Sequence, residues 1–243
     1  MNLEGRVALV TGAARRVGRA IALRLARSGC RVAVHYGRSR ADAQATVDLC
    51  RAAGAEAKPF AADLADVDET RRLVPMVLEY FGRLDILVNN ASVFERMTLD
   101  EFDLERWRRT LHVNVTAPLM LALAARDALR AARGRIVNLC DVSSARPWPD
   151  HLAYGVSKGA LDTLTRLLAR AMAPDVNVVG VAPGVAAFPE HYDAALRAKL
   201  TAKIPLAREG TPEDIAAAVH FLVLEGDYVT GTILPIDGGR RLT

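Results

Sequence analysis

Two side chains four positions apart could hold and transfer a proton. Tyr154 and Lys158 lie in AYGVSKGALDTLTRLLARA, whose apolar spacing predicts one amphipathic helix over residues 153–171. A separation of four residues places the phenol and the ammonium on the same helix face. Because a nearby ammonium favours the phenolate, we expect Lys158 to lower the pKa of Tyr154 from its usual value of about 10 toward neutral pH. The alternative is an ordinary surface pair with no chemical role.

Asp141 directly follows the apolar run GRIVNLC, which predicts a buried strand over residues 134–140. Open α/β sheets bind ligands at the carboxyl ends of their strands. We therefore expect the Asp141 carboxyl group to lie in a binding site, where a bound ligand would shield it from water and let it take part in protonation. A loop aspartate without such a role is the alternative.

A glycine-rich segment near the start of the chain predicts a phosphate-binding turn. Residues 6–10 form an apolar run, Gly12 follows in TGAARRVG, and apolar residues recur at helical spacing over 17–27. A strand, a glycine turn and a helix start form a cradle for anions, because free N–H groups and the positive helix end face the ligand. Arg16 stands where a middle glycine is expected, and it could contact a cofactor phosphate or form a salt bridge at the site.

The end of the second predicted strand, RVAVHYGRS, indicates which dinucleotide binds. An NAD-binding fold usually places a carboxylate about 20 residues after the glycine turn, where it bonds the ribose 2′-hydroxyl. Here Arg38 and Ser39 occupy that region, and the first carboxylate is Asp42. A guanidinium suits a 2′-phosphate, with which it forms two parallel hydrogen bonds. The pattern favours NADP(H), although a solvated loop arginine would look the same.

The elements that must position these residues alternate along the whole chain. Apolar runs predict seven strands separated by amphipathic helices, near 7–11, 31–36, 56–60, 85–89, 134–140, 176–181 and 232–236. Right-handed crossovers then give an α/β fold of the Rossmann type, a doubly wound parallel seven-stranded sheet with helices on both faces. No linker or repeat interrupts the alternation, so residues 1–243 are predicted to form a single NADP(H)-binding catalytic domain. The long irregular stretch after the sixth strand predicts a substrate loop near residues 185–205.

Composition and charge argue against several classes of protein. The formal net charge of +4 and the sequence pI of about 9.2 come mostly from arginines scattered along predicted helices. Such scattering is typical of solvated helix faces, and no basic stretch interleaved with aromatics indicates nucleic-acid binding. No apolar run approaches the roughly 20 residues that cross a membrane. The first strand also starts too close to Met1 to leave room for a signal peptide.

Cysteine and histidine usage favours a cytoplasmic protein without a metal site. The three cysteines are odd in number and irregularly spaced, as expected of reduced thiols in a cytoplasm. Cys140 adjoins Asp141, but we interpret it as a buried strand cysteine. The five histidines lack metal-ligand spacing. We interpret His151, three residues before Tyr154, as a loop residue rather than a catalyst.

These motifs resemble those of the short-chain dehydrogenase/reductase family along essentially the whole chain. The resemblance rests on TGAARRVG, ADL at 62–64, NNAS at 89–92, Asn114 in HVNVTAP, Tyr154-x-x-x-Lys158, Pro183-Gly184 and TGTILPIDGG.

Within that family the chain is more specifically similar to pteridine reductases and their bacterial dihydromonapterin reductase relatives. Those proteins share an arginine in place of the middle glycine, an HY-x-RS phosphate clamp and an aromatic residue shortly after NNAS. They also place an aspartate thirteen residues before the tyrosine, where most of the family has serine. All four features occur here together, as Arg16, His35–Ser39, Asn89–Phe94 and Asp141.

The resemblance implies a site for NADPH and a flat pterin. Lys158 would hold the nicotinamide ribose, and Asn114 would anchor a water that links Lys158 to solvent, unless Asn114 is exposed or bonded within its helix. The pterin would stack between the nicotinamide and Phe94, a contact worth about 0.5–1.5 kcal/mol, unless Phe94 belongs to the core. The implied catalytic residues are Asp141, Tyr154, Lys158 and Asn114, and the implied substrate contacts are Arg16, Ser92, Phe94, Asp141 and Tyr154. The implied cofactor contacts are Gly12, Arg15, Arg16, Val17, Gly18, His35, Tyr36, Arg38, Ser39, Asp63, Leu64, Asn90, Ala91, Ser92, Tyr154, Lys158, Pro183, Gly184 and Val185.

The same resemblance implies a homotetramer. The predicted helices around 103–132 and 153–173 carry more large apolar residues than the sheet alone is expected to cover, and such a surplus marks interfaces. These residues are Trp107, Leu111, Leu119, Leu161, Leu164 and Leu168. The alternative is that all six belong to the core.

Three functions are compatible with these residues, and the resemblance to pteridine reductases favours the first. The first is an NADPH-dependent reductase that transfers hydride to a pteridine ring, converting a dihydropterin of the dihydrobiopterin, dihydromonapterin or dihydrofolate type to a tetrahydropterin. The second is a general short-chain reductase of ketones, aldehydes or 3-oxoacyl groups, in which Asp141 merely replaces the usual serine. The third is an NADP(H)-binding sensor without catalysis. The complete set of Tyr154, Lys158, Asn114 and Asp141 disfavours a sensor, which needs no proton donor.

Overall fold

Seven parallel strands form the centre of the structure, a computed structural model that describes residues 1–186 and 193–243. The strands lie in the order β3-β2-β1-β4-β5-β6-β7, so the direction of progression reverses between β1 and β4. Their bounds are Val7–Val10 (β1), Arg31–Tyr36 (β2), Ala57–Ala61 (β3), Ile86–Asn89 (β4), Arg135–Leu139 (β5), Asn177–Pro183 (β6) and Ile233–Ile236 (β7). All seven predicted strands are confirmed, each within two residues of its predicted ends.

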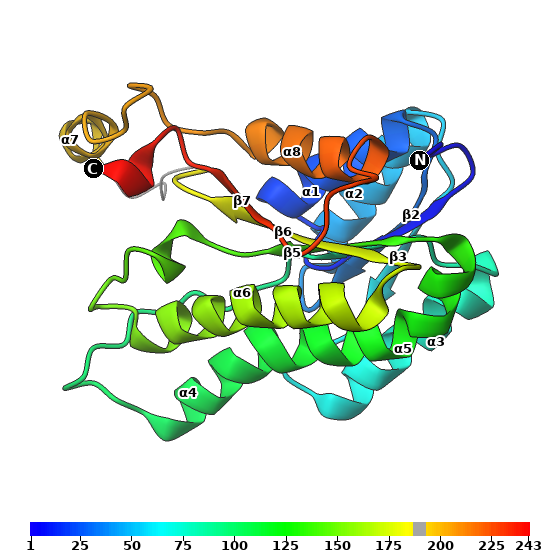
Figure 1. Cartoon of the computed structure of the whole chain (residues 1–243), viewed down its shortest axis with the longest axis horizontal. Coiled ribbons are helices and arrows are strands. Elements are labelled where there is room, and N and C mark those ends of the chain that lie inside the picture. The colour runs from blue at the N-terminus through cyan, green and yellow to red at the C-terminus, as the bar shows by residue number, and fades with distance from the viewer. Residues whose placement is uncertain (187–192) are drawn as a thin grey trace.

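Helices cover both faces of the sheet, which explains why its central strands are almost continuously apolar. One face packs against α1 (Arg16–Arg27), α2 (Arg40–Ala52) and α8 (Pro212–Leu224), and the other against α3 (Val67–Phe81), α5 (Ala117–Ala132) and α6 (Leu152–Met172). Figure 1 shows these two helical layers above and below the strands. The predicted doubly wound α/β fold is confirmed. Within the described residues, no helix combines the length and the apolar character needed to span a bilayer.

The predicted helix around 103–132 is divided by a π turn. It consists of α4 (Leu104–Leu111), the π turn η1 (His112–Thr116) and α5. A π turn widens a helix locally and is often found at functional sites. Asn114 lies at its centre, so the irregularity falls on a residue that the sequence singled out.

The stretch after β6 is not irregular throughout, which corrects the sequence prediction. Helix α7 spans Ala194–Thr201, and the Asp193 carboxylate caps it by accepting a hydrogen bond from the Leu196 N–H at 2.7 Å. Its sequence AALRAKLT is rich in strong helix formers, which accounts for the helix. The predicted substrate loop near 185–205 is described only in part, because 187–192 lie outside the described residues.

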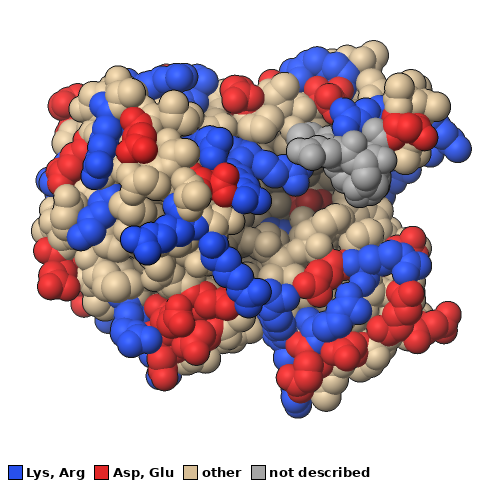
Figure 2. All heavy atoms as spheres, turned by 180° about the vertical axis from the view of Figure 1, so that it is seen from behind, with Lys and Arg blue, Asp and Glu red and all other residues tan. Residues whose placement is uncertain are grey.

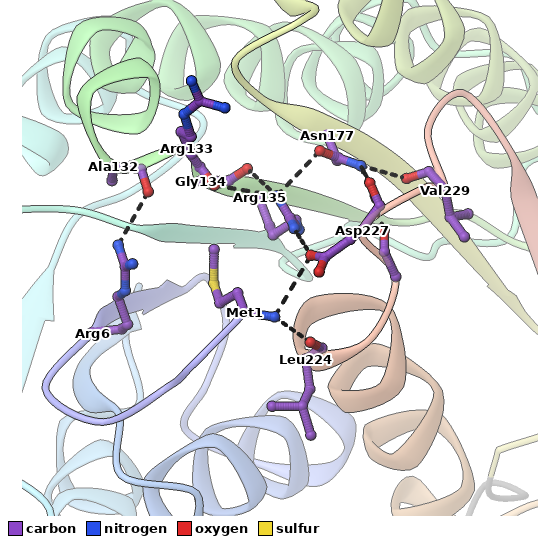
Figure 3. Close-up of polar contacts among 11 residues, drawn as sticks. Met1, Arg6, Ala132, Arg133, Gly134, Arg135, Asn177, Leu224, Asp227 and Val229 are labelled. Atoms are coloured by element: carbon purple, nitrogen blue, oxygen red, sulfur yellow. Dashed lines mark hydrogen bonds and ion pairs between the residues drawn. The ribbon is translucent and has the colours of Figure 1, made fainter.

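A polar network holds together the amino ends of β5 and β6 (Figure 3). The buried guanidinium of Arg135 contacts the Asp227 carboxylate and donates to Asn177 Oδ1 at 3.1 Å. The Met1 ammonium donates to the Leu224 carbonyl and lies 3.6 Å from Asp227. These contacts join the two strands to the end of α8. They lie at the edge of the sheet opposite to the carboxyl ends of the strands, where the predicted site residues gather.

Candidate active site

Helix α6 carries both members of the predicted proton-transfer pair. Tyr154 and Lys158 are buried, at 7% and 3% relative exposure, and neither is the surface residue of the alternative interpretation. The Lys158 ammonium donates to the Leu139 carbonyl at 2.7 Å, at the end of β5. The predicted helix over 153–171 is confirmed as part of α6, and it directs this pair toward the carboxyl edge of the sheet.

Asp141 meets Tyr154 directly. It follows β5 in extended conformation and begins the short 3₁₀ turn η2 (Val142–Ser144). Its Oδ1 accepts from the Ser143 N–H at 2.7 Å, and its Oδ2 accepts from the Tyr154 hydroxyl at 2.7 Å. The structure therefore brings Asp141, Tyr154 and Lys158 to one place at the end of β5.

The electrostatics of Tyr154 contradict the expectation that Lys158 lowers its pKa. Burial, together with the charge and hydrogen bond of Asp141, raises the pKa of Tyr154 well above its ordinary value. Burial lowers the pKa of Lys158, and the charges of Asp141 and Asp162 oppose this shift. The prediction was wrong because the ammonium faces the Leu139 carbonyl, 5.5 Å from the centre of the Tyr154 ring, while the hydroxyl faces a carboxylate. In the ligand-free site, Tyr154 therefore keeps its proton.

Asn114 fastens the loop after β4 to α6. Its Nδ2 donates to the Val93 carbonyl at 3.0 Å and to Ser157 Oγ at 2.9 Å. Its Oδ1 accepts from the Val93 N–H at 2.8 Å and from Ser92 Oγ at 3.2 Å. Asn114 is therefore neither exposed nor bonded only within its own helix. Its amide is fully engaged, so the expected water link to Lys158 would have to use its backbone, and that link stays a prediction.

The predicted phosphate turn has the close backbone approach that its glycines suggest. A Cβ at position 18 would lie 2.3 Å from the Gly12 carbonyl oxygen, so only glycine lets α1 approach the turn this closely. Gly12 and Arg16 both have positive φ, at 62° and 50°, which bends the chain sharply between β1 and α1. Arg15 and Val17 flank Arg16 at the start of the helix.

His35 supports the turn from inside the protein. It is 2% exposed, its Nδ1 accepts from the Gly12 N–H at 3.0 Å, and its Nε2 donates to the Ala62 carbonyl at 2.9 Å. Burial lowers the pKa of His35 to about 4, which keeps the ring neutral and lets Nδ1 accept. The sequence placed His35 among the cofactor contacts, but with both ring nitrogens engaged it shapes the site rather than facing it.

Thr11, which the sequence interpretation did not single out as a contact, ties this turn to the segment after β4. Its Oγ1 accepts from the backbone N–H groups of Asn90 and Ala91 at 2.9 and 3.0 Å. The Asn90 amide in turn donates to the Thr11 carbonyl at 2.8 Å. Two of the predicted cofactor-binding segments are thus locked to each other. The Thr-Gly pair that opens TGAARRVG could have indicated this role of Thr11 from the sequence.

The predicted 2′-phosphate end of the site is open and basic. The Arg38 side chain is 88% exposed and lies 3.8 Å from Asp63 Oδ2. Beside it, Ser39 immediately precedes α2, and Arg15 pairs with Asp42 on that helix at 2.7 Å. Tyr36, at the end of β2, is half-buried, and Leu64, after Asp63, is buried. Figure 2 shows a hollow on one face of the molecule, with many lysine and arginine side chains and some acidic ones around it.

The segment after β6 reaches the site from the other half of the sheet. A Cβ at Gly184, which follows Pro183, would lie 2.8 Å from the Cβ of Asp237, so the chain after β6 passes tightly against the end of β7. Val185 lines a cavity of about 480 Å³ together with Leu206, Arg208 and Ile236. Across the described residues, no group of three or more His, Cys, Asp or Glu side chains forms a possible metal site.

Three aromatic side chains, Phe94, Trp148 and His151, form a wall beside Tyr154, here called the aromatic wall. Phe94 is 55% exposed, so it does not belong to the core. It stacks on His151 with ring centres 4.5 Å apart and meets the Tyr154 ring edge-on at 4.7 Å. Trp148 contacts both other members of the wall edge-on. The sequence predicted Phe94 as a substrate contact. It did not single out Trp148, and it suggested only a loop position for His151.

The cysteine beside the site is structural. Cys140 is 3% exposed, and burial raises the pKa of its thiol well above the ordinary value, so the thiolate is disfavoured. This agrees with its interpretation as a buried strand residue. Cys30 and Cys50 are also buried and free.

Comparison with known protein families shows which family this chain belongs to. A family model described as enoyl-(acyl carrier protein) reductase matches residues 12–241. A solved mutant of a short-chain dehydrogenase/reductase from Serratia marcescens is 34% identical, with a TM-score of 0.93 over 99% of this chain and 100% of that one. The chain belongs to the short-chain dehydrogenase/reductase family.

Other members of the short-chain dehydrogenase/reductase family are similar over the same span. An uncharacterized oxidoreductase of Methylorubrum extorquens is 38% identical over 99% of both chains. The 3-oxoacyl-[acyl-carrier-protein] reductase of Synechocystis is 35% identical over 98% of this chain and 97% of its own. A blue fluorescent protein from a metagenomic library, solved in complex with NADPH, is 35% identical, with a TM-score of 0.92 over 99% of both chains. None of these proteins is named as a pteridine reductase, so the finer resemblance stays a prediction.

Proposed function

We propose that this chain is an NADPH-dependent reductase that delivers hydride to the carbonyl carbon of a small organic substrate. The observation that carries the proposal is the Tyr154 hydroxyl, held protonated by burial and by Asp141 at the carboxyl edge of the sheet. A protonated phenol beside a buried ammonium is what the reduction of a C=O bond requires, since the oxygen gains negative charge as hydride arrives. The likeness to a 3-oxoacyl reductase supports a carbonyl substrate.

The residues present fit NADPH. The turn from Gly12 to Gly18 is packed so closely that a Cβ at position 18 would lie 2.3 Å from the Gly12 carbonyl oxygen, and its backbone N–H groups lie at a helix start, where phosphate binds. Arg38 and Ser39 suit a 2′-phosphate, because a guanidinium bonds phosphate at two points. The complex of a relative with NADPH supports this choice. When bound, NADPH would supply the hydride.

The remaining chemistry belongs to the protein. The Tyr154 hydroxyl would leave the Asp141 carboxylate, donate its proton to the substrate oxygen and become a phenolate. Lys158 would stabilise that phenolate, and this charge is the reason to keep an ammonium buried near the ring. Asn114, through Ser157 and Val93, would keep α6 and the loop after β4 in register while the proton moves.

A pteridine ring C=N bond is a second candidate acceptor, and one observation favours it. Asp141 occupies the position of a serine and bonds Tyr154 directly, so a carboxyl group is available to relay a proton to a ring nitrogen. The exposed face of Phe94, backed by His151, would stack on a flat ring. Ser92, two residues before Phe94, and Arg16 would complete the contacts implied for a pterin.

One assay separates these candidates. Purified protein with NADPH is offered a 3-oxoacyl thioester, a simple ketone and a dihydropterin, and cofactor oxidation is followed by absorbance. We expect turnover of a carbonyl substrate and its loss in Tyr154→Phe, which keeps the ring but not the proton. Turnover of the dihydropterin alone would favour the second candidate. NADPH binding without any turnover would favour the sensor.

The setting of the enzyme is part of the same proposal. Three buried free cysteines fit a reducing compartment, so we place the enzyme in a cytoplasm. Assembly into a homotetramer is supported by family resemblance and by apolar side chains left exposed on α5 and α6.

A further inference from the structure

One face of α6 holds the end of β5 at three successive points. Tyr154, Lys158 and Asp162 follow one another at intervals of four residues and therefore share that face. Tyr154 donates to the Asp141 carboxylate and Lys158 donates to the Leu139 carbonyl, both at 2.7 Å. At the third point, Asp162 Oδ2 accepts from the Ser144 hydroxyl, also at 2.7 Å. The first two contacts belong to the proton-transfer site, but the third has no role in the mechanism described so far.

Ser144 connects this third point to Asp141. Its Oγ lies 2.9 Å from the Asp141 carbonyl oxygen, and its N–H donates to the same carbonyl at 3.2 Å. The Asp141 backbone is thus held from the side of Asp162, while the Asp141 carboxylate is held by the Ser143 N–H and the Tyr154 hydroxyl. Because the turn η2 is only three residues long, Ser144 cannot move without moving Asp141.

Asp162 is not an ordinary surface acid. It is half-buried and takes part in no salt bridge among residues 1–186 and 193–243. Its charge opposes the effect of burial on the Lys158 pKa and raises the pKa of the neighbouring Cys140 thiol. Asp162 is therefore a partly buried acid that bonds the short turn η2 through Ser144, and this bond can hold the turn in place.

We propose that Asp162 and Ser144 are positioning residues, which act through Asp141 to keep its carboxylate on the Tyr154 hydroxyl. This inference rests on the proposed function, because it describes how the proton donor of that reaction is oriented. The observed contacts of Asp162 and Ser144 are with each other and with the Asp141 backbone, so the role proposed for them is indirect. Displacing a catalytic group by about 1 Å can lower a rate a hundredfold, so a brace at the backbone of Asp141 is expected to matter for turnover.

The first test compares two replacements of Asp162. Asp162→Leu removes the hydrogen bond, whereas Asp162→Asn keeps an oxygen that accepts from Ser144. We expect single-turnover NADPH oxidation to fall roughly tenfold to a hundredfold in Asp162→Leu and in Ser144→Ala, with NADPH affinity unchanged. Asp162→Asn should stay within about threefold of wild type, well inside that range. Equal losses in the Asn and Leu variants would overturn the brace. Thr163→Ala, an exposed neighbour on α6, is the matched control, and melting curves confirm folding.

The second test asks whether the effect passes through Asp141. In a protein that already carries Asp141→Asn, Ser144→Ala should lower the rate by less than about twofold, since there is no carboxylate left to position. The same loss in both backgrounds would overturn the proposal. Crystal structures give a readout that needs no activity, because Ser144→Ala should lengthen the distance between the Tyr154 and Asp141 oxygens beyond 3.5 Å, the outer limit of a hydrogen bond. An unchanged distance would contradict the brace, whereas an inactive wild type would contradict only the proposed function.

Discussion

Asp141 controls the proton on Tyr154 through a hydrogen bond of 2.7 Å. The carboxylate stabilises the protonated phenol in the ligand-free site, so Tyr154 keeps its proton to a higher pH than an ordinary tyrosine does. In the proposed reaction, a substrate would take the place of this carboxylate before it receives the proton. Asp141, which stands where the resemblance implies a serine, therefore affects the protonation of Tyr154 directly.

Replacing Asp141 with asparagine should distinguish the two candidate substrates. We expect turnover of a dihydropterin to fall about 10²–10⁴-fold, the usual span for a general acid, and turnover of a ketone to fall much less. Since the charge of Asp141 raises the pKa of Tyr154, its removal should lower that pKa and move the alkaline limb of the rate profile to lower pH. The measurement is single-turnover NADPH oxidation across pH. If Asp141→Asn kept the wild-type rate on both substrates and the wild-type pH profile, Asp141 would have no role in protonation.

Arg38→Ala should weaken NADPH selectively. Loss of a charge-assisted contact with a 2′-phosphate costs about 1.5–3 kcal/mol, or roughly tenfold to a hundredfold in affinity. NADH lacks that phosphate, so its affinity should not change. Titration calorimetry with both dinucleotides checks this, and Arg71→Ala, an exposed arginine on α3 that pairs with Asp68, is the control. Equal wild-type affinities for NADPH and NADH would contradict the assignment of Arg38.

At the scale of elements, the cofactor turn depends on how closely α1 approaches the end of β1. Helix propensity alone would predict that alanine at Gly18 stabilises α1 by about 1 kcal/mol. The structure predicts the opposite, because the added Cβ would lie 2.3 Å from the Gly12 carbonyl oxygen. We expect Gly18→Ala to lower the melting temperature and to weaken NADPH binding. Gly159→Ala on α6, where a Cβ meets nothing within 4 Å, should instead be neutral or stabilising.

His35 should make the stability of the fold sensitive to acid, because its ring on β2 bonds Gly12 after β1 and Ala62 after β3. Its pKa is about 4 in the folded protein and about 6.5 when unfolded, so only the unfolded chain takes up its proton between these values. The stabilisation is complete above pH 6.5 and falls by up to about 3 kcal/mol as the pH drops toward 4.

Urea unfolding at pH 7.5 and pH 5 provides the measurement. Wild type should lose more stability between these values than His35→Asn, which has no titrating ring. His151 and His220, whose pKa values burial also lowers, remain in both proteins and cancel in the comparison. Parallel pH dependence in the two proteins would show that His35 does not contribute.

The sequence predicted elements better than it predicted electrostatics. Strand and helix periods located the sheet and α6, and the position of Asp141 after a strand indicated its place at the carboxyl edge of the sheet, where it bonds Tyr154. The pKa of Tyr154 was mispredicted because spacing along a helix gives proximity but neither burial nor the direction of a hydroxyl. His35 and Asn114 were predicted to serve the site directly, yet their polar side-chain atoms bond backbone groups and serine hydroxyls of distant segments. Such long-range hydrogen bonds leave no periodic signal.

At the scale of the whole molecule, apolar side chains on α5 and α6 remain without a cover. Leu161 and Leu168 belong to the core, so they do not contribute to the apolar surplus from which an interface was predicted. The other four, Trp107, Leu111, Leu119 and Leu164, are partly buried. In contrast, Leu123 and Leu167 are 55% and 61% exposed, and the sequence had not singled them out.

Leu167→Arg should weaken self-association. A charge placed in an apolar interface is left without a partner on burial, so a tetramer should dissociate toward smaller species. Sedimentation velocity at micromolar concentration checks this, with Leu49→Arg on α2, 47% exposed, as the control for an added charge. A wild type that sediments only as a monomer would refute the predicted homotetramer.

The aromatic wall also gives the protein an optical reporter. The chain has two tryptophans, and Trp148 lies in the wall at 39% exposure, whereas Trp107 packs against Phe102 with ring centres 6.0 Å apart. Indole emission responds to the exchange of surrounding water for a ligand, and a reduced nicotinamide absorbs where indole emits. In a Trp107→Phe protein, the light from a single fluorophore would therefore record ligand arrival at the mouth of the site in real time, separately from the colour change that records chemistry.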